Sequence, residues 1–115
     1  MNNYISTAKR PTAIARQRNK NTKTIADIFS DGAIIIDVRT INEFDRAKIL
    51  GAKHIAYDQL YLFLDKIKKW NVPVIVYSSH GYRSKLACDF LRKSRIEVID
   101  GGSKQELEER LSVER

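Results

Sequence analysis

Two short apolar runs constrain the fold of this chain most, because neither alternates with polar residues. They occupy residues 33–36 (Ala-Ile-Ile-Ile) and 74–77 (Val-Ile-Val-Tyr). A strand that is apolar at every position is buried on both faces, as in parallel sheets. Helical patterns separate the predicted strands, so we predict an α/β fold: a central parallel sheet with helices on both faces.

The remaining elements follow from spacing and turn residues. We expect a short strand after the turn at 51–55 and a third strand at 96–99, closed by the turn Asp100-Gly101-Gly102. Thr40 with Glu43 and Ser103 with Glu106 form two capping boxes, which mark helix starts. The predicted helices cover residues 24–29, 40–44, 59–70 and 83–93 and a last segment with Leu107 and Leu111 inward.

A polar loop follows the second apolar run and leads into a helical pattern. In a strand, loop and helix start of this kind, backbone N–H groups converge on an anion. Gly81 allows a backbone conformation closed to other residues, and Arg83 adds a positive charge. We predict a site for a small anion, or alternatively an ordinary strand-to-helix connection. The predicted anion-binding loop comprises Ser79, His80, Gly81, Tyr82, Arg83 and Ser84.

Ser78 is the first residue of this loop, where a nucleophile would stand. A cysteine there would be a thiolate with a pKa in the range of about 3.5–7.5 found at helix N-termini. A serine hydroxyl is a weak nucleophile unless an adjacent base takes its proton. The chain has only two histidines, His54 and His80, and only His80 is near in sequence, so a Ser-His-acid triad has little support.

Asp37 and Arg39 follow the first apolar run and reach the same end of the predicted sheet as the loop. We interpret them, together with Glu43, as supporting residues of the site. An internal ion pair between Asp37 and Arg39 is favoured over a catalytic role.

The positive charge is concentrated in an N-terminal arm. The chain of 115 residues has a net charge of +7, and residues 1–23 carry six basic residues and no acid, which leaves +1 for residues 24–115. We therefore divide the chain into a basic arm, 1–23, and one domain, 24–115. The arm would contact an acidic protein or a nucleic acid, act as a solvated tail, or serve as an organelle transit peptide.

Cys88 is the only cysteine, which excludes an internal disulfide and a multi-cysteine zinc site. We expect no metal and no cofactor. No apolar run approaches the ~20 residues of a membrane span, so no membrane partner is expected. A reducing, cytoplasmic location is the prediction.

The motifs together resemble the rhodanese (sulfurtransferase) domain family over about residues 24–107. Asp37-Val38-Arg39 followed by Glu43-Phe44 is similar to the family's first signature, and 74–84 to its active-site strand, loop and helix start. Gly51-Ala52 and Asp100-Gly101-Gly102 resemble its later turns. The resemblance implies a rhodanese-like three-layer fold and a loop cysteine that carries a persulfide from a donor such as thiosulfate. The loop of this chain, from Ser78 to Arg83, is similar in length to that of the sulfurtransferases and is one residue shorter than in the related phosphatases.

The chain departs from the family pattern at the position that matters most. Ser78 stands where the family has its cysteine, and Ala47-Lys48-Ile49, Ala56 and Ser94-Arg95 replace other usual residues. The serine is either natural or an engineered replacement. The sequence therefore predicts a sulfurtransferase-type domain that binds an anion but is inactive as written. The alternative is a non-catalytic protein- or nucleic-acid-interaction module acting through the basic arm.

Overall fold

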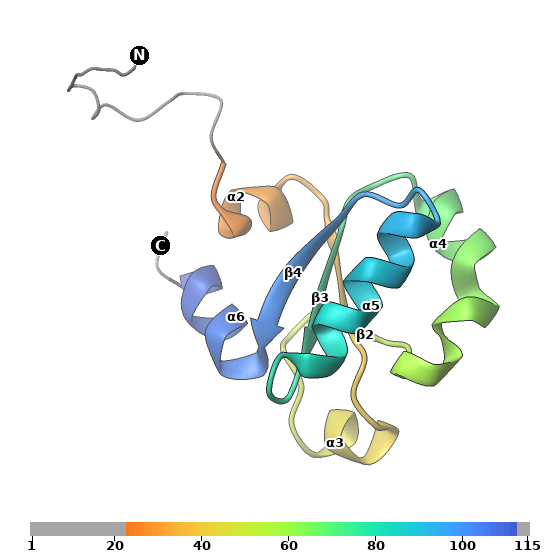
Figure 1. Ribbon diagram of the computed structural model, residues 1–115. Coiled ribbons are helices and arrows are strands. Elements are labelled where there is room, and N and C mark those ends of the chain that lie inside the picture. Colours follow the sequence, from red (N-terminus) through yellow and green to blue (C-terminus); the bar gives the residue numbers. More distant parts are fainter. Residues whose placement is uncertain (1–22, 113–115) are drawn as a thin grey trace, which may run out of the picture.

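The computed structural model describes residues 23–112, and these form one twisted sheet with helices on both faces (Figure 1). The four strands are all parallel and lie in the order β2-β1-β3-β4. Their bounds are β1 Ile34–Asp37, β2 Lys53–His54, β3 Val74–Ser78 and β4 Val98–Ser103. The predicted parallel sheet is confirmed, and the two continuous apolar runs lie in its central strands β1 and β3.

Alternate residues of these strands pack into two separate hydrophobic cores, one on each face of the sheet. Ile36 and Val76 pack in a core with η1, α4 and α5, whereas Ile35 and Ile75 pack in a second core with α2 and α6. The predicted three layers are therefore present. The helices are α2 Ile25–Ser30, α3 Ile41–Arg46, the 3-10 helix η1 Tyr57–Phe63, α4 Leu64–Trp70, α5 Tyr82–Lys93 and α6 Lys104–Ser112.

Both predicted capping boxes are present. The Thr40 hydroxyl accepts a hydrogen bond from the Glu43 N–H, and the Glu43 carboxylate accepts one from the Thr40 N–H. Ser103 and Glu106 make the same reciprocal pair at the start of α6. A third box, Thr24 with Asp27, begins α2.

The predicted helix over 59–70 is wrong in its first half. Residues Tyr57–Phe63 form a 3-10 helix, and the α-helix begins only at Leu64. Leu60 is buried and Phe63 is partly buried, a spacing of three residues that matches the 3-10 repeat. Leu62 fits the helical pattern in sequence but is 64% exposed, so the apolar pattern does not describe the buried face.

The expected turn at Asp100-Gly101-Gly102 is also wrong, because β4 runs through it to Ser103. Val76 pairs with Asp100 and Tyr77 with Gly102, which leaves Gly101 as the extra residue of a β-bulge. A Cβ atom on Gly101 would lie 3.0 Å from the Val76 carbonyl oxygen, and Gly102 has φ +81°. The two glycines therefore serve close packing and a bulge within the strand.

No helix among residues 23–112 is long and apolar enough to cross a membrane.

Arg95 adopts a backbone conformation that favours glycine. Its φ is +67°, and it lies just after α5. The Arg95 N–H donates to the Arg92 carbonyl, and the Ile96 N–H donates to the Leu91 carbonyl. These two bonds define a Schellman motif with Arg95 at the position usually held by glycine. The departure from the family pattern at Ser94-Arg95 therefore carries a backbone cost.

We expect Arg95→Gly to raise the free energy of unfolding by about 1 kcal/mol, because glycine adopts this left-handed conformation without the steric strain of a Cβ atom. Urea denaturation measures the change. Lys85→Gly is the control: Lys85 is exposed within α5, where glycine should cost about 1 kcal/mol. An Arg95→Gly variant less stable than the original chain would contradict the assignment.

Candidate functional site

The loop between β3 and α5 lies at the carboxyl end of the sheet, as predicted from the sequence. β3 ends at Ser78, and α5 begins at Tyr82 after Gly81, whose φ is +87°. A positive φ is strained for residues with a Cβ, so glycine allows the chain to turn into the helix here. The loop thus brings the N-terminus of α5 against the end of β3.

Two backbone N–H groups converge on the side chain of Ser78. The N–H groups of Gly81 and Ser84 donate to Ser78 Oγ at 3.0 and 3.1 Å. Ser78 is only 1% exposed. Both donors belong to the start of a helix, whose dipole adds positive potential at the same place. The geometry favours negative charge on the γ atom of residue 78.

The Ser84 hydroxyl fixes the loop to β4. Its Oγ lies 3.0 Å from the Gly81 carbonyl oxygen, 2.9 Å from Asp100 Oδ1 and 3.4 Å from the Gly102 carbonyl oxygen. Asp100 Oδ1 also accepts the Gly102 N–H at 2.9 Å. Ser84 thus offers its N–H to Ser78, while its hydroxyl donates toward the bulge in β4. Sequence reasoning missed this use of Asp100; the signal was an acid immediately before Gly-Gly.

Glu43 holds the other side of the loop. Its Oε2 accepts a hydrogen bond from Ser79 Oγ at 2.9 Å, and its Oε1 lies 3.5 Å from Arg83 Nη2. Hydrogen bonds from the Thr40 N–H, and then from the Ser79 and Thr40 hydroxyls and the Arg83 charge, lower the pKa of Glu43 to about 2. The carboxylate therefore stays ionised and anchors the loop and Arg83.

Asp37 and Arg39 form a buried ion pair beside the loop. Arg39 Nε lies 3.0 Å from each carboxylate oxygen and Nη2 lies 2.7 Å from Oδ2, while the Arg39 N–H donates to Oδ1 at 2.9 Å. Asp37 is 0% exposed and Arg39 6%. Arg39 Nη2 also donates to the Ala47 carbonyl. The guanidinium is therefore directed into the structure.

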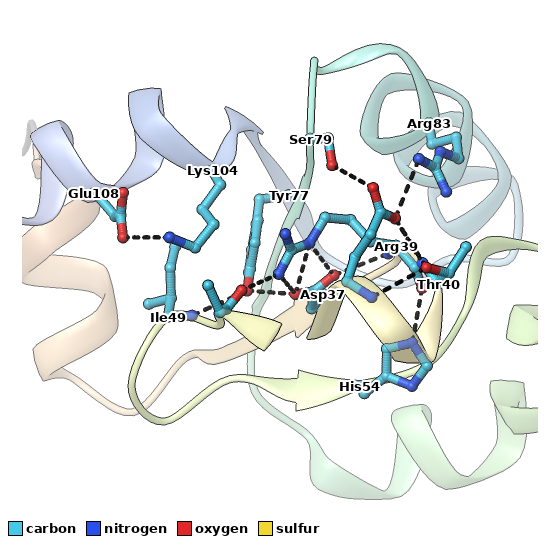
Figure 2. A network of polar contacts seen from close by, with 12 residues as sticks. Asp37, Arg39, Thr40, Ile49, His54, Tyr77, Ser79, Arg83, Lys104 and Glu108 are labelled. Atoms are coloured by element: carbon cyan, nitrogen blue, oxygen red, sulfur yellow. Dashed lines mark hydrogen bonds and ion pairs between the residues drawn. The ribbon is translucent and has the colours of Figure 1, made fainter. Parts of the chain in front are cut away.

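Tyr77 completes this network, as Figure 2 shows. Its hydroxyl donates to Asp37 Oδ2 at 2.6 Å and accepts the Ile49 N–H at 3.1 Å. Burial first, and then the hydrogen bond to Asp37, raise the pKa of Tyr77, so the phenol keeps its proton. Sequence reasoning treated Tyr77 only as a strand residue. The available signal was a hydroxyl at a fully buried position, which needs partners.

Neither histidine is placed to activate Ser78. His80 is exposed and makes no hydrogen bond to Ser78. His54 Nε2 lies 2.7 Å from the Arg39 carbonyl oxygen, and its ring packs against Phe44. Tyr82 is 72% exposed. Over the part of the chain that the structure describes, the site has converging donors and a cation but no base hydrogen-bonded to Ser78.

Cys88 lies in the core of the domain and is 1% exposed. Burial raises the pKa of its thiol to about 12, so it is not a thiolate nucleophile. Within residues 23–112, no group of three or more His, Cys, Asp or Glu side chains could hold a metal ion.

Most of the basic arm lies outside the described residues, so its partner and the boundary at residue 23 stay predictions. Lys23 is described, and its Nζ pairs with Asp31 at 2.6 Å.

A parallel α/β sheet with this loop at its carboxyl end defines a class of protein. The family model for the rhodanese-like domain matches residues 18–108, and the chain belongs to this family. A relative, the uncharacterized protein YqhL of Bacillus subtilis (strain 168), is 38% identical over 76 residues. The match covers 64% of this chain and 60% of YqhL.

Solved structures agree on the fold. The reduced CoADR-RHD protein of Bacillus anthracis superposes with a TM-score of 0.65 at 25% identity, covering 79% of this chain and 16% of that one. A rhodanese-related protein of Thermoplasma volcanium gives 0.63 at 24% identity, covering 76% of this chain and 92% of that one. This chain thus spans 16% of the first structure's length.

The low pKa of Glu43 predicts a pH-dependent contribution to stability. The folded pKa of Glu43, about 2, lies below the ordinary 4.5. The contribution to stability is therefore present above pH 4.5 and is lost as the pH falls from 4.5 to about 2. Glu43→Gln keeps the capping geometry but not this titration. We expect the original chain to lose more stability than Glu43→Gln between these pH values, measured by urea denaturation.

Glu97→Gln, which removes an exposed carboxylate just before β4, is the matched control. Parallel losses in the original chain and Glu43→Gln would show that Glu43 is not held as an ionised anchor.

Proposed function

We propose that the loop from Ser78 to Ser84 is an anion site of the sulfurtransferase type in which serine replaces the nucleophilic cysteine. The observation that carries the proposal is the pair of N–H groups, from Gly81 and Ser84, donated to the γ atom of residue 78. Two donors and a helix N-terminus would stabilise a thiolate or persulfide there. Membership of the rhodanese-like family supports the same chemistry.

With cysteine at position 78, the reaction is a pair of sulfur transfers. The thiolate attacks the outer sulfur of thiosulfate; the new S–S bond forms as the sulfur–sulfur bond of thiosulfate breaks, and sulfite leaves with the electron pair. An acceptor such as cyanide then attacks the terminal sulfur of the persulfide, and thiocyanate forms as the thiolate is restored. The N–H groups stabilise negative charge on the sulfur throughout, and Arg83 attracts the anionic donor.

Serine at this position retains the cradle and removes the nucleophile. Ser78 Oγ accepts both N–H groups, but among the described residues no base is hydrogen-bonded to it to take its proton. Cys88 is buried in the core formed with α5 and does not replace it. We therefore expect the chain to bind small anions at this loop without transferring sulfur.

Ser78→Cys should create sulfur transfer from thiosulfate to cyanide, measured as thiocyanate released. The original chain and Ser78→Ala should show no transfer above the uncatalysed rate. Cys88→Ala in the Ser78→Cys background should retain the activity, because Cys88 is buried in the core.

Sulfur transfer by the original chain would contradict the assignment of Ser78 as an inactive replacement. A folded Ser78→Cys variant without transfer would contradict the sulfurtransferase-type site.

A further inference from the structure

Ser84 connects β4 to residue 78 through two of its own groups. Its N–H donates to Ser78 Oγ at 3.1 Å, and its hydroxyl oxygen lies 2.9 Å from Asp100 Oδ1. Ser84 is 0% exposed and Ser78 is 1% exposed, so both bonds lie away from bulk water. A single buried residue therefore links the carboxylate of Asp100 to the γ atom of residue 78.

The Ser84 N–H has no carbonyl partner in its own helix. Ser84 is the third residue of α5, and N–H groups in the first turn of a helix have no acceptor four residues back. The ladder of α5 begins one residue later, where the Lys85 N–H donates to the Gly81 carbonyl at 3.1 Å. The direction of the Ser84 N–H therefore depends on the contacts that hold this first turn in place.

Asp100 provides the charged acceptor for the Ser84 hydroxyl. The Gly81 and Gly102 carbonyl oxygens lie 3.0 and 3.4 Å from Ser84 Oγ, but a hydroxyl has one proton to donate. A carboxylate is the stronger acceptor, so the proton is directed to Asp100. Asp100 Oδ1 also accepts the Gly102 N–H at 2.9 Å, which fixes the carboxylate at the bulge of β4. The hydroxyl thus ties the first turn of α5 to the sheet.

We propose that Asp100 is a positioning residue of the loop, which accepts the Ser84 hydroxyl and so keeps the Ser84 N–H directed at the γ atom of residue 78. Asp100 acts through Ser84 and makes no hydrogen bond with residue 78 itself within the described range. The charge to be stabilised is that of a thiolate or persulfide, so the inference rests on the proposed function.

The charge of Asp100 and its hydrogen bond to Ser84 act in opposite directions on a thiol at position 78. A negative charge near a thiolate disfavours it and raises the pKa of the thiol. An N–H held on the sulfur favours the thiolate and lowers that pKa. Removing the charge alone should therefore lower the pKa, whereas releasing the N–H should raise it.

The test measures the pKa of the thiol at position 78 in the Ser78→Cys, Cys88→Ala protein, from the pH dependence of its alkylation rate. A hydrogen bond to a charged group is strong enough that we expect Asp100→Ala to raise this pKa by about one pH unit. Asp100→Asn keeps an acceptor oxygen for the Ser84 hydroxyl and removes the charge. It should leave the pKa unchanged or lower it, and a rise as large as that in Asp100→Ala would overturn the proposal.

Ser84→Ala separates positioning from every other role of Asp100. If Asp100 acts through the Ser84 hydroxyl, Asp100→Ala should no longer raise the pKa once Ser84→Ala is present, because the two effects are coupled. Equal rises with and without Ser84→Ala would overturn the positioning role. Asp65→Ala is the matched control: Asp65 is exposed on α4, and its removal should not change the pKa.

Ser84→Ala alone gives a second measurement if Asp100→Ala does not fold. It leaves the carboxylate of Asp100 in place and removes only the hydroxyl, so it should also raise the pKa. An unchanged pKa in a folded Ser84→Ala variant would overturn the proposal.

The pKa measurement needs no sulfur transfer, so the two proposals can fail separately. If Ser78→Cys transfers sulfur but neither Asp100→Ala nor Ser84→Ala raises the pKa, the positioning role is overturned and the sulfurtransferase-type site stands. If the two substitutions raise the pKa in a coupled way but no sulfur is transferred, the positioning role stands and the proposed function fails.

Discussion

The buried carboxylate of Asp37 is the constraint on which the carboxyl end of this sheet depends. Burying an unpaired charge is costly, and here the cost is offset by the backbone N–H, Nε and Nη2 donors of Arg39 and by the Tyr77 hydroxyl. Through these partners Asp37 joins β1 to β3 and to the segment before β2, since Tyr77 accepts the Ile49 N–H. Loss of any partner would leave a buried polar group unsatisfied.

This network also determines where the loop residues can lie. Thr40 follows Arg39 directly and caps α3, and the cap holds Glu43 toward Ser79 and Arg83. On the other side, Ser84 attaches the start of α5 to Asp100 in β4. The loop is therefore fixed from both sides. Such fixed N–H donors stabilise charge without the cost of reorganising at the moment of reaction.

The sequence predicts the parts of the structure that depend on local pattern. Continuous apolar runs placed β1 and β3 in the centre of the sheet, and the Thr40–Glu43 spacing located the start of α3. Asp37 and Ser78 are the last residues of two neighbouring parallel strands, so both lie at the carboxyl end of the sheet.

The parts that the sequence did not predict depend on contacts between distant residues. The bulge at Gly101 arises from packing against Val76 in the neighbouring strand, so Gly-Gly looked like a turn. The 3-10 helix η1 leaves Leu62 exposed, which hydrophobic spacing alone does not reveal. The Tyr77 hydroxyl bonds to Ile49, which is 28 positions away in the sequence, and to Asp37, which is 40 positions away. No local motif marks such bonds.

The central claim is that fixed N–H donors favour negative charge on the γ atom of residue 78. The most direct test is the pKa of the thiol introduced at position 78 in a Ser78→Cys, Cys88→Ala protein, measured from the pH dependence of its alkylation rate. The account predicts a value well below the ordinary pKa of about 8.5, within the range of about 3.5–7.5 found at helix N-termini. A pKa at or above the ordinary value would contradict it.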